Sequence, residues 1–203
     1  MKLNVVRLNE VPACAAGGII GALVFLFAFP KGAINTLMHA VLGLPGPGAG
    51  IAVVVGPFVI LVGLIAALLT RRAGSAAIAG LAFAATQALL SGLLGMASGG
   101  SGALSSPLSI VGIALPGVAV EAALALGKGV KSRQRSMVAG ALANAVLLGF
   151  YWTVVFPRTY KPVAPRDVPL LMGLALAGGL LSGYVAWAAC NLLRRTFALK
   201  ERQ

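Results

Sequence analysis

The run GIALPGVAVEAALALG, residues 112–127, is apolar throughout except for Glu121, and the whole chain has only four acidic residues. With the residues just before it, the run is long enough to cross a bilayer, which needs about 20 apolar residues in a helix. A charged side chain at the centre of a bilayer costs about 2.5–3.5 kcal/mol. Glu121 is therefore predicted to face the interior of a helix bundle, either in a functional site or in a hydrogen bond between helices.

The rest of the chain has the same apolar character. Of its 203 residues, 59% are hydrophobic and 10% are charged, and the mean hydropathy is +0.97. A water-soluble domain cannot bury so much apolar surface, so the composition indicates an all-α integral membrane protein. Windows of about 20 residues predict six transmembrane helices in a single transmembrane domain, residues 1–203. The predicted spans are about 11–29, 50–69, 74–95, 107–127, 137–156 and 169–193.

The distribution of basic residues predicts the orientation in the membrane. With six spans both termini lie on one side, and that side collects twelve of the sixteen Lys and Arg residues. Such a bias marks the cytoplasmic side, so the N- and C-termini are both predicted to be cytoplasmic. The net charge of +12 then reflects topology and attraction to the headgroups of the lipid bilayer, and we expect no nucleic-acid binding.

Residue sets that carry catalysis are absent from the sequence. Cys14 and Cys190 have no spacing suited to a metal site, and no Ser/His/acid set is plausibly spaced. No Gly-rich loop ending in Lys-Ser/Thr is present either. We therefore expect no enzyme and no metal site. A solute carrier or receptor, a small channel and an accessory subunit remain.

The first predicted span carries Ala13, Gly17 and Gly21 at four-residue spacing, on one helix face. Small residues at this spacing let another transmembrane helix approach closely. The approaching helix belongs either to the same chain or to a partner subunit, and the spacing alone leaves both open.

The segment between the first two predicted spans is too long and too apolar for a simple connector. A short helix against the outer membrane face is predicted here, because Ile34, Leu37, Met38 and Val41 repeat at helical spacing. Asn35 and His39 lie on the same segment. Long loops of this kind are often lids or binding loops. The inner connections are short, so a functional site is expected to face outward.

Polar residues within the predicted spans fall at two depths. At about 1.5 Å of rise per residue, Glu121 and Asn144 lie near the inner boundary, where they can meet if their helix faces match. Gln87, Tyr151 and Trp152 lie nearer the outer side. Aromatic stacking and amide hydrogen bonds there would suit a flat, polar, ring-shaped solute. The aromatic residues are equally compatible with an interfacial belt.

Six short helices with both ends inside, a small-residue stripe and a lid-like first outer loop resemble an S component. S components are the substrate-capture subunits of energy-coupling factor (ECF) transporters, and the resemblance is greatest to the hydroxymethylpyrimidine or thiamine-precursor type. The segments that carry it are TRRAGSAAIAGLAFAATQALLSG (70–92), GIALPGVAVEAALAL (112–126) and LALAGGLLSGYVAW (174–187). Glu121 corresponds to the acidic residue in the Gly-x-x-x-Gly-x-x-x-Glu pattern of that type's fourth helix. Ala73 stands where that type usually has a proline. Gln87 is the nearest polar substitute for the acidic residue expected in that type's third helix.

The resemblance implies an ECF S-component-like bundle that captures substrate for a vitamin or micronutrient importer in the plasma membrane of a prokaryotic cell. The ligand would be hydroxymethylpyrimidine, thiamine or a related ring compound. A transmembrane coupling subunit and two ATPase subunits would be the partners and would hydrolyse ATP, so this chain would hold no cofactor. A small helical membrane channel or a non-transporting accessory membrane protein is the alternative. Under the resemblance the docking face is Ala13, Gly17 and Gly21, and the ligand-binding candidates are Asn35, His39, Gln87, Glu121, Asn144, Tyr151 and Trp152.

Overall fold

The computed structural model describes residues 5–29, 33–45, 48–94, 107–127, 131–159 and 163–200. These residues are helical apart from short connections, and an isolated β-bridge joins Val5 to Ala73. The long helices are α1 (Val11–Ala28), α3 (Gly56–Thr70), α4 (Ser75–Leu94), α5 (Pro107–Leu126), α6 (Ser132–Phe150) and α8 (Val168–Lys200). The shorter segments are η1 (Leu8–Glu10), α2 (Ala33–Asn35), η2 (Thr36–Val41), η3 (Ile51–Val55), η5 (Tyr151–Val155), α7 (Phe156–Thr159) and η6 (Pro165–Asp167).

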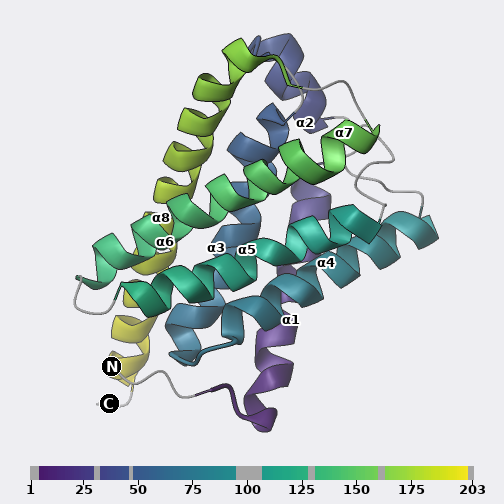
Figure 1. The fold of residues 1–203 in the computed structure, drawn as a ribbon. Helices are drawn as coiled ribbons and strands as arrows, with labels where there is room; N and C mark the ends of the chain where they lie inside the picture. Colours follow the sequence, from purple (N-terminus) through teal and green to yellow (C-terminus); the bar gives the residue numbers. More distant parts are fainter. Residues whose placement is uncertain are drawn as a thin grey trace.

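The long helices form two crossed sets. In Figure 1, α4, α5 and α6 lie side by side, and α1, α3 and α8 cross them. Helix α3 is central, since it contacts α1, α4, α5, α6 and α8. A change in the course of α3 therefore affects most of the bundle.

The bundle has two ends with different composition. At one end α1 begins and α8 ends beside the α3–α4 turn, where Val6 N donates to Ala73 O over 3.0 Å and Arg194 donates to the Leu68 carbonyl. We call this the termini end. The segments α2, η2, η3, η5 and α7 lie at the opposite end (Figure 1), which we call the π-helix end because η2, η3 and η5 are π-helical.

Each predicted span overlaps a long helix, and several boundaries differ. Helix α6 begins at Ser132 rather than near 137, and α8 continues to Lys200 rather than 193. Hydropathy reports the apolar part of a helix and cannot detect a polar turn that continues it. Within the described residues, the helical segments long and apolar enough to span a membrane are Leu8–Ala28, Ile51–Thr70, Ser132–Arg158 and Pro165–Thr196, with shorter apolar helices at Ser75–Leu90 and Ile110–Leu126.

Helix α4 packs closely on α5, and α6 on α8, at small residues. A Cβ atom added to Gly140 of α6 would lie 2.2 Å from the Gly179 carbonyl oxygen of α8, and one on Gly117 of α5 would lie 2.4 Å from the Ala76 carbonyl oxygen of α4. Such backbone-to-backbone approach is how helices associate in lipid, where no hydrophobic force drives them together. The buried cluster here consists of Ile, Leu, Val and Ala side chains.

Candidate ligand-binding site

Two of the π-helical segments at the π-helix end stand at the same position relative to a proline. Segment η3 is followed by Gly56 and Pro57, and η5 by Phe156 and Pro157. Proline has no backbone N–H to donate to the preceding turn and its ring crowds that turn. A π turn widens the helix locally and is frequent at functional sites. The sequence signal for these turns was the proline near the start or end of a predicted span.

The π-helical segments are brought together by glycines. Gly48 has φ +107°, a conformation that residues with a Cβ rarely adopt, and a Cβ there would lie 3.1 Å from Trp152 Nε1. A Cβ on Gly50 would lie 2.7 Å from Ile34 Cγ2. The first connection thus folds back over η3 and η5. The predicted short helix is present as α2 and η2. Of the apolar residues that predicted it, Ile34 and Met38 are buried, whereas Leu37 and Val41 are exposed.

Aromatic side chains fill the core below this contact. Tyr151 is 1% exposed, and its ring centroid lies 5.6 Å from that of Phe156. A further group comes from α1, α3 and α4, where the Phe25 centroid is 5.2 Å from Phe58 and 6.0 Å from Phe83. Tyr151 and Trp152 lie together at the π-helix end, and Tyr151 is a core residue rather than part of an exposed belt.

Asn144 is fully buried between α6, η3 and α8. Its Nδ2 donates to the Ala52 carbonyl over 2.9 Å and to the Ala175 carbonyl over 2.7 Å. Its Oδ1 has no hydrogen-bond donor within the described residues and lies against Gly56. Asn144 is thus a buried polar group that joins three elements just below the aromatic core.

Gln87 also lies at the π-helix end. Its Nε2 donates to the Ala22 carbonyl over 3.1 Å and the side chain is 7% exposed. Ala22 belongs to the same buried cluster as Phe25, Phe83 and Tyr151. The amide therefore joins α4 to α1 and lies at the aromatic end of the bundle.

The two candidates on the first connection differ. His39 is exposed, and its Nδ1 lies 2.8 Å from the Leu44 carbonyl oxygen, so the ring stabilises the return of the chain from η2. The backbone of Asn35 ends α2, but its side chain lies outside the described residues.

Glu121 lies elsewhere, at the termini end. Its Oε1 accepts a hydrogen bond from Ala76 N over 2.7 Å. Ala76 is in the first turn of α4, whose N–H groups have no partner within the helix and favour a negative charge. Glu121 therefore caps α4 from α5. Glu121 and Asn144 do not meet: Glu121 bonds to α4, and Asn144 bonds to the Ala52 and Ala175 carbonyls.

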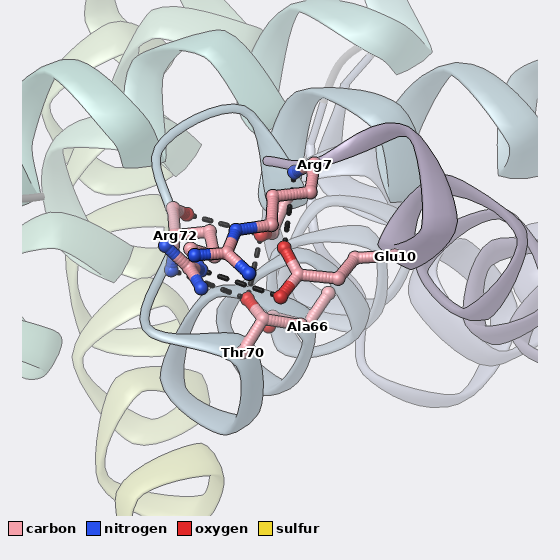
Figure 2. A network of polar contacts seen from close by, with 6 residues as sticks. Arg7, Glu10, Ala66, Thr70 and Arg72 are labelled. Carbon is pink, nitrogen blue, oxygen red and sulfur yellow. Dashed lines mark hydrogen bonds and ion pairs between the residues drawn. The ribbon is translucent and has the colours of Figure 1, made fainter. Parts of the chain in front are cut away.

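Other charged side chains at the termini end also bond to helix ends or turns. Arg135 donates to the Leu124 carbonyl near the end of α5. Figure 2 shows the polar network around Glu10, whose carboxylate lies 3.3 Å from Arg72 Nε and accepts from Arg7 N over 3.0 Å. In the same network the Thr70 hydroxyl lies 2.6 Å from that of Ser75. The segment before α1 is thus tied to the α3–α4 turn.

The residues of the predicted docking stripe, Ala13, Gly17 and Gly21, are not all exposed. Ala13 and Gly17 are exposed, and a Cβ on Gly17 would meet no atom within 4 Å. Gly21 is buried, and a Cβ there would lie 2.6 Å from Val62 Cγ2 of α3. The inclusion of Gly21 in an exposed face is therefore wrong, since this glycine serves packing within the chain.

No protein-family model matches the chain, and no curated protein matches it. A solved structure described as "Crystal structure of an S-component of ECF transporter" matches with a TM-score of 0.69 and 23% identity, over 97% of this chain and 89% of that chain. The chain is a multi-pass membrane protein whose described residues form a helical bundle with the fold of an ECF transporter S component. That structure is described as a transporter component, and the match concerns the fold.

Proposed function

We propose that the chain is the substrate-capture subunit of an ECF-type importer. The observation that carries this proposal is the fold match along 97% of the chain. The arrangement of the site supports it, because aromatic and amide side chains gather at one end beneath a long connection that folds over them. A channel requires a stripe of polar residues along several helices. The buried polar residues among those described do not form such a stripe; they are Ser75, Gln87, Ser136, Asn144 and Ser182.

In this proposal the six long helices all cross the plasma membrane of a prokaryotic cell and the termini end is cytoplasmic. The exposed cations Arg7, Arg71, Lys131, Arg133 and Arg195 support this orientation, because they lie at or near the termini end. The π-helix end then faces outward and receives the ligand. A cysteine placed at position 203 should be labelled by membrane-impermeant reagents only after the cells are opened.

The proposed ligand is hydroxymethylpyrimidine, thiamine or a related flat ring compound. Trp152 would stack on the ring, and the Gln87 and Asn144 amides would lie beneath it, with Tyr151 as the supporting wall. Asn35 and His39 would lie on the covering connection. A transmembrane coupling subunit and two ATPase subunits would complete the importer, and ATP would be bound by those partners.

Gentle purification of the tagged chain, followed by mass spectrometry of retained small molecules and copurified proteins, tests the proposal. We expect a pyrimidine-containing compound and ATPase subunits. Titration with hydroxymethylpyrimidine and thiamine then compares their affinities. A chain that retains no ring compound, binds neither probe and copurifies with no ATPase would contradict the proposal and favour the channel or accessory class.

A further inference from the structure

The start of α3 contains a backbone acceptor that its own helix leaves unbonded. In an α-helix the Ala52 carbonyl would accept from Gly56 N–H, but the Gly56 N–H donates to the Ile51 carbonyl. In a π turn the donor would be the next N–H, and residue 57 is proline, which has none. A buried carbonyl without a donor costs about 1–3 kcal/mol. Ala52 therefore needs a donor from outside its helix.

Asn144 provides that donor, and the adjacent glycine makes room for it. The Asn144 Nδ2 lies 2.9 Å from the Ala52 carbonyl oxygen. A Cβ on Gly56 would lie 1.9 Å from Asn144 Oδ1, so any other residue at 56 would displace the amide. The pair Gly56-Pro57 thus creates both the unbonded carbonyl and the space through which a side chain of α6 reaches it.

Helix α8 also bonds to the segment around Ala52 and Pro57, where the backbone hydrogen bonding of the helix is interrupted. Asn144 Nδ2 donates to the Ala175 carbonyl, and Ser182 Oγ lies 2.8 Å from the Pro57 carbonyl oxygen. Both Nδ2 hydrogens of Asn144 are therefore used by backbone carbonyls. No donor of this amide is left for a ligand, and its Oδ1 faces Gly56.

We propose that Asn144 is a positioning residue: it replaces the N–H that Pro57 lacks and so holds η3 in the shape that the ligand site needs. This inference rests on the proposed function, because η3 borders the residues assigned to the ligand. Asn144 then acts on affinity through η3 and does not touch the ligand. Its role differs from that of Trp152, which is proposed to contact the ring.

A double-mutant cycle between Asn144→Ala and Pro57→Ala tests the proposal. In the wild-type background, Asn144→Ala should weaken binding of hydroxymethylpyrimidine or thiamine about tenfold. In the Pro57→Ala background the same change should cost less than about threefold, because the backbone N–H restored at position 57 can bond to the preceding turn. Equal losses in the two backgrounds would show a direct ligand contact and overturn the proposal.

Hydrogen exchange without ligand separates this inference from the proposed function. Amides of η3 should exchange faster in Asn144→Ala and regain protection in the double variant. If neither probe binds the wild-type chain, the proposed ligand class fails while the exchange result still decides whether Asn144 holds η3. Unchanged exchange in Asn144→Ala would overturn the positioning role.

Two controls complete the design. Ser136→Ala removes a buried hydroxyl whose partners among the described residues are the Ser132 and Arg133 carbonyls of α6, so its effect should be the same in both backgrounds. If Asn144→Ala does not fold, the cycle uses Asn144→Ser, and folding recovered only with Pro57→Ala supports the proposal. Failure of both Asn144 variants to fold in both backgrounds contradicts it.

Discussion

The two ends of the bundle use polar groups and glycine differently. At the termini end the charged side chains of Glu10, Glu121, Arg135 and Arg194 bond to helix ends or to the α3–α4 turn, and backbones touch at glycine. At the π-helix end the buried polar groups named above are uncharged, namely the Gln87 and Asn144 amides and the Ser182 hydroxyl. The core there is aromatic, and the helices widen before prolines. The first arrangement bonds charged groups to helix ends and resists change. The second leaves backbone acceptors of its helices to be bonded by side chains from neighbouring helices.

The largest expected effect tests the close packing of helix backbones at glycine. Gly140→Ala places a Cβ 2.2 Å from the Gly179 carbonyl oxygen, where backbone rather than a flexible side chain must move. Overpacking typically costs about 1–3 kcal/mol, and a backbone clash belongs at or beyond the upper end. We expect little monodisperse protein on size-exclusion chromatography in detergent. Gly149→Ala on the same helix is the control, because its Cβ meets nothing within 4 Å and the variant should purify normally.

The next effect concerns the exposed part of α1. Gly17→Leu should reduce ligand uptake by cells more than about tenfold while binding to the purified chain persists, because a large side chain prevents a partner helix from approaching. Val24→Leu, at an exposed position of the same helix that already carries a branched side chain, should leave uptake unchanged. Normal uptake by the Gly17→Leu chain would show that this face contacts only lipid.

A third prediction compares two tryptophans, one at each end. Trp152→Ala should weaken binding of hydroxymethylpyrimidine or thiamine by about 1–3 kcal/mol, the usual value of stacking between a base and an aromatic ring. Trp187→Ala is the matched change at the termini end, where the indole donates to Ser132 Oγ over 3.2 Å. Isothermal titration should detect a loss only for Trp152. Equal losses would mean that the affinity reflects general stability rather than contact with the ring.

Much of the helical architecture was predictable because apolar windows report where a helix can cross lipid. The gathering of Gln87, Tyr151 and Trp152 at one end followed from counting residues along those helices. The partners of individual side chains were not predictable. Which helices cross, and at which turn, depends on glycine contacts such as Gly140 with Gly179, and these have no signature apart from small size.

The π turns and the position of Asn144 lay beyond hydropathy for a different reason. A proline near a span boundary usually marks the end of a helix, whereas Pro57 and Pro157 lie within continuous helical segments. The missing N–H is evident in the sequence at residue 57. Its consequence depends on which side chain lies beside Ala52, and the three-dimensional structure alone identifies that side chain as Asn144.

The smallest expected effect concerns Glu121 and separates the two ends most sharply. Its carboxylate accepts from Ala76 N in the first turn of α4. Removing an acceptor at a helix N-terminus costs about 0.5–2 kcal/mol. Glu121→Ala should therefore lower the free energy of unfolding in detergent by that amount. Glu121→Gln retains an acceptor oxygen and should lose less, the difference being the interaction of the charge with the helix dipole, about 0.3–1 kcal/mol.

Affinity is the measurement that distinguishes capping from ligand binding at Glu121. Because its hydrogen bond is to α4 at the termini end, both variants should bind hydroxymethylpyrimidine or thiamine within about twofold of wild type, well below the tenfold that corresponds to about 1.4 kcal/mol. A role at the ligand, which the sequence also allowed, would instead make Glu121→Gln lose affinity while keeping its stability, since a charge-assisted bond to the ligand would become a neutral one. Unfolding and titration curves of the same preparations therefore assign the acid to one end of the molecule or the other.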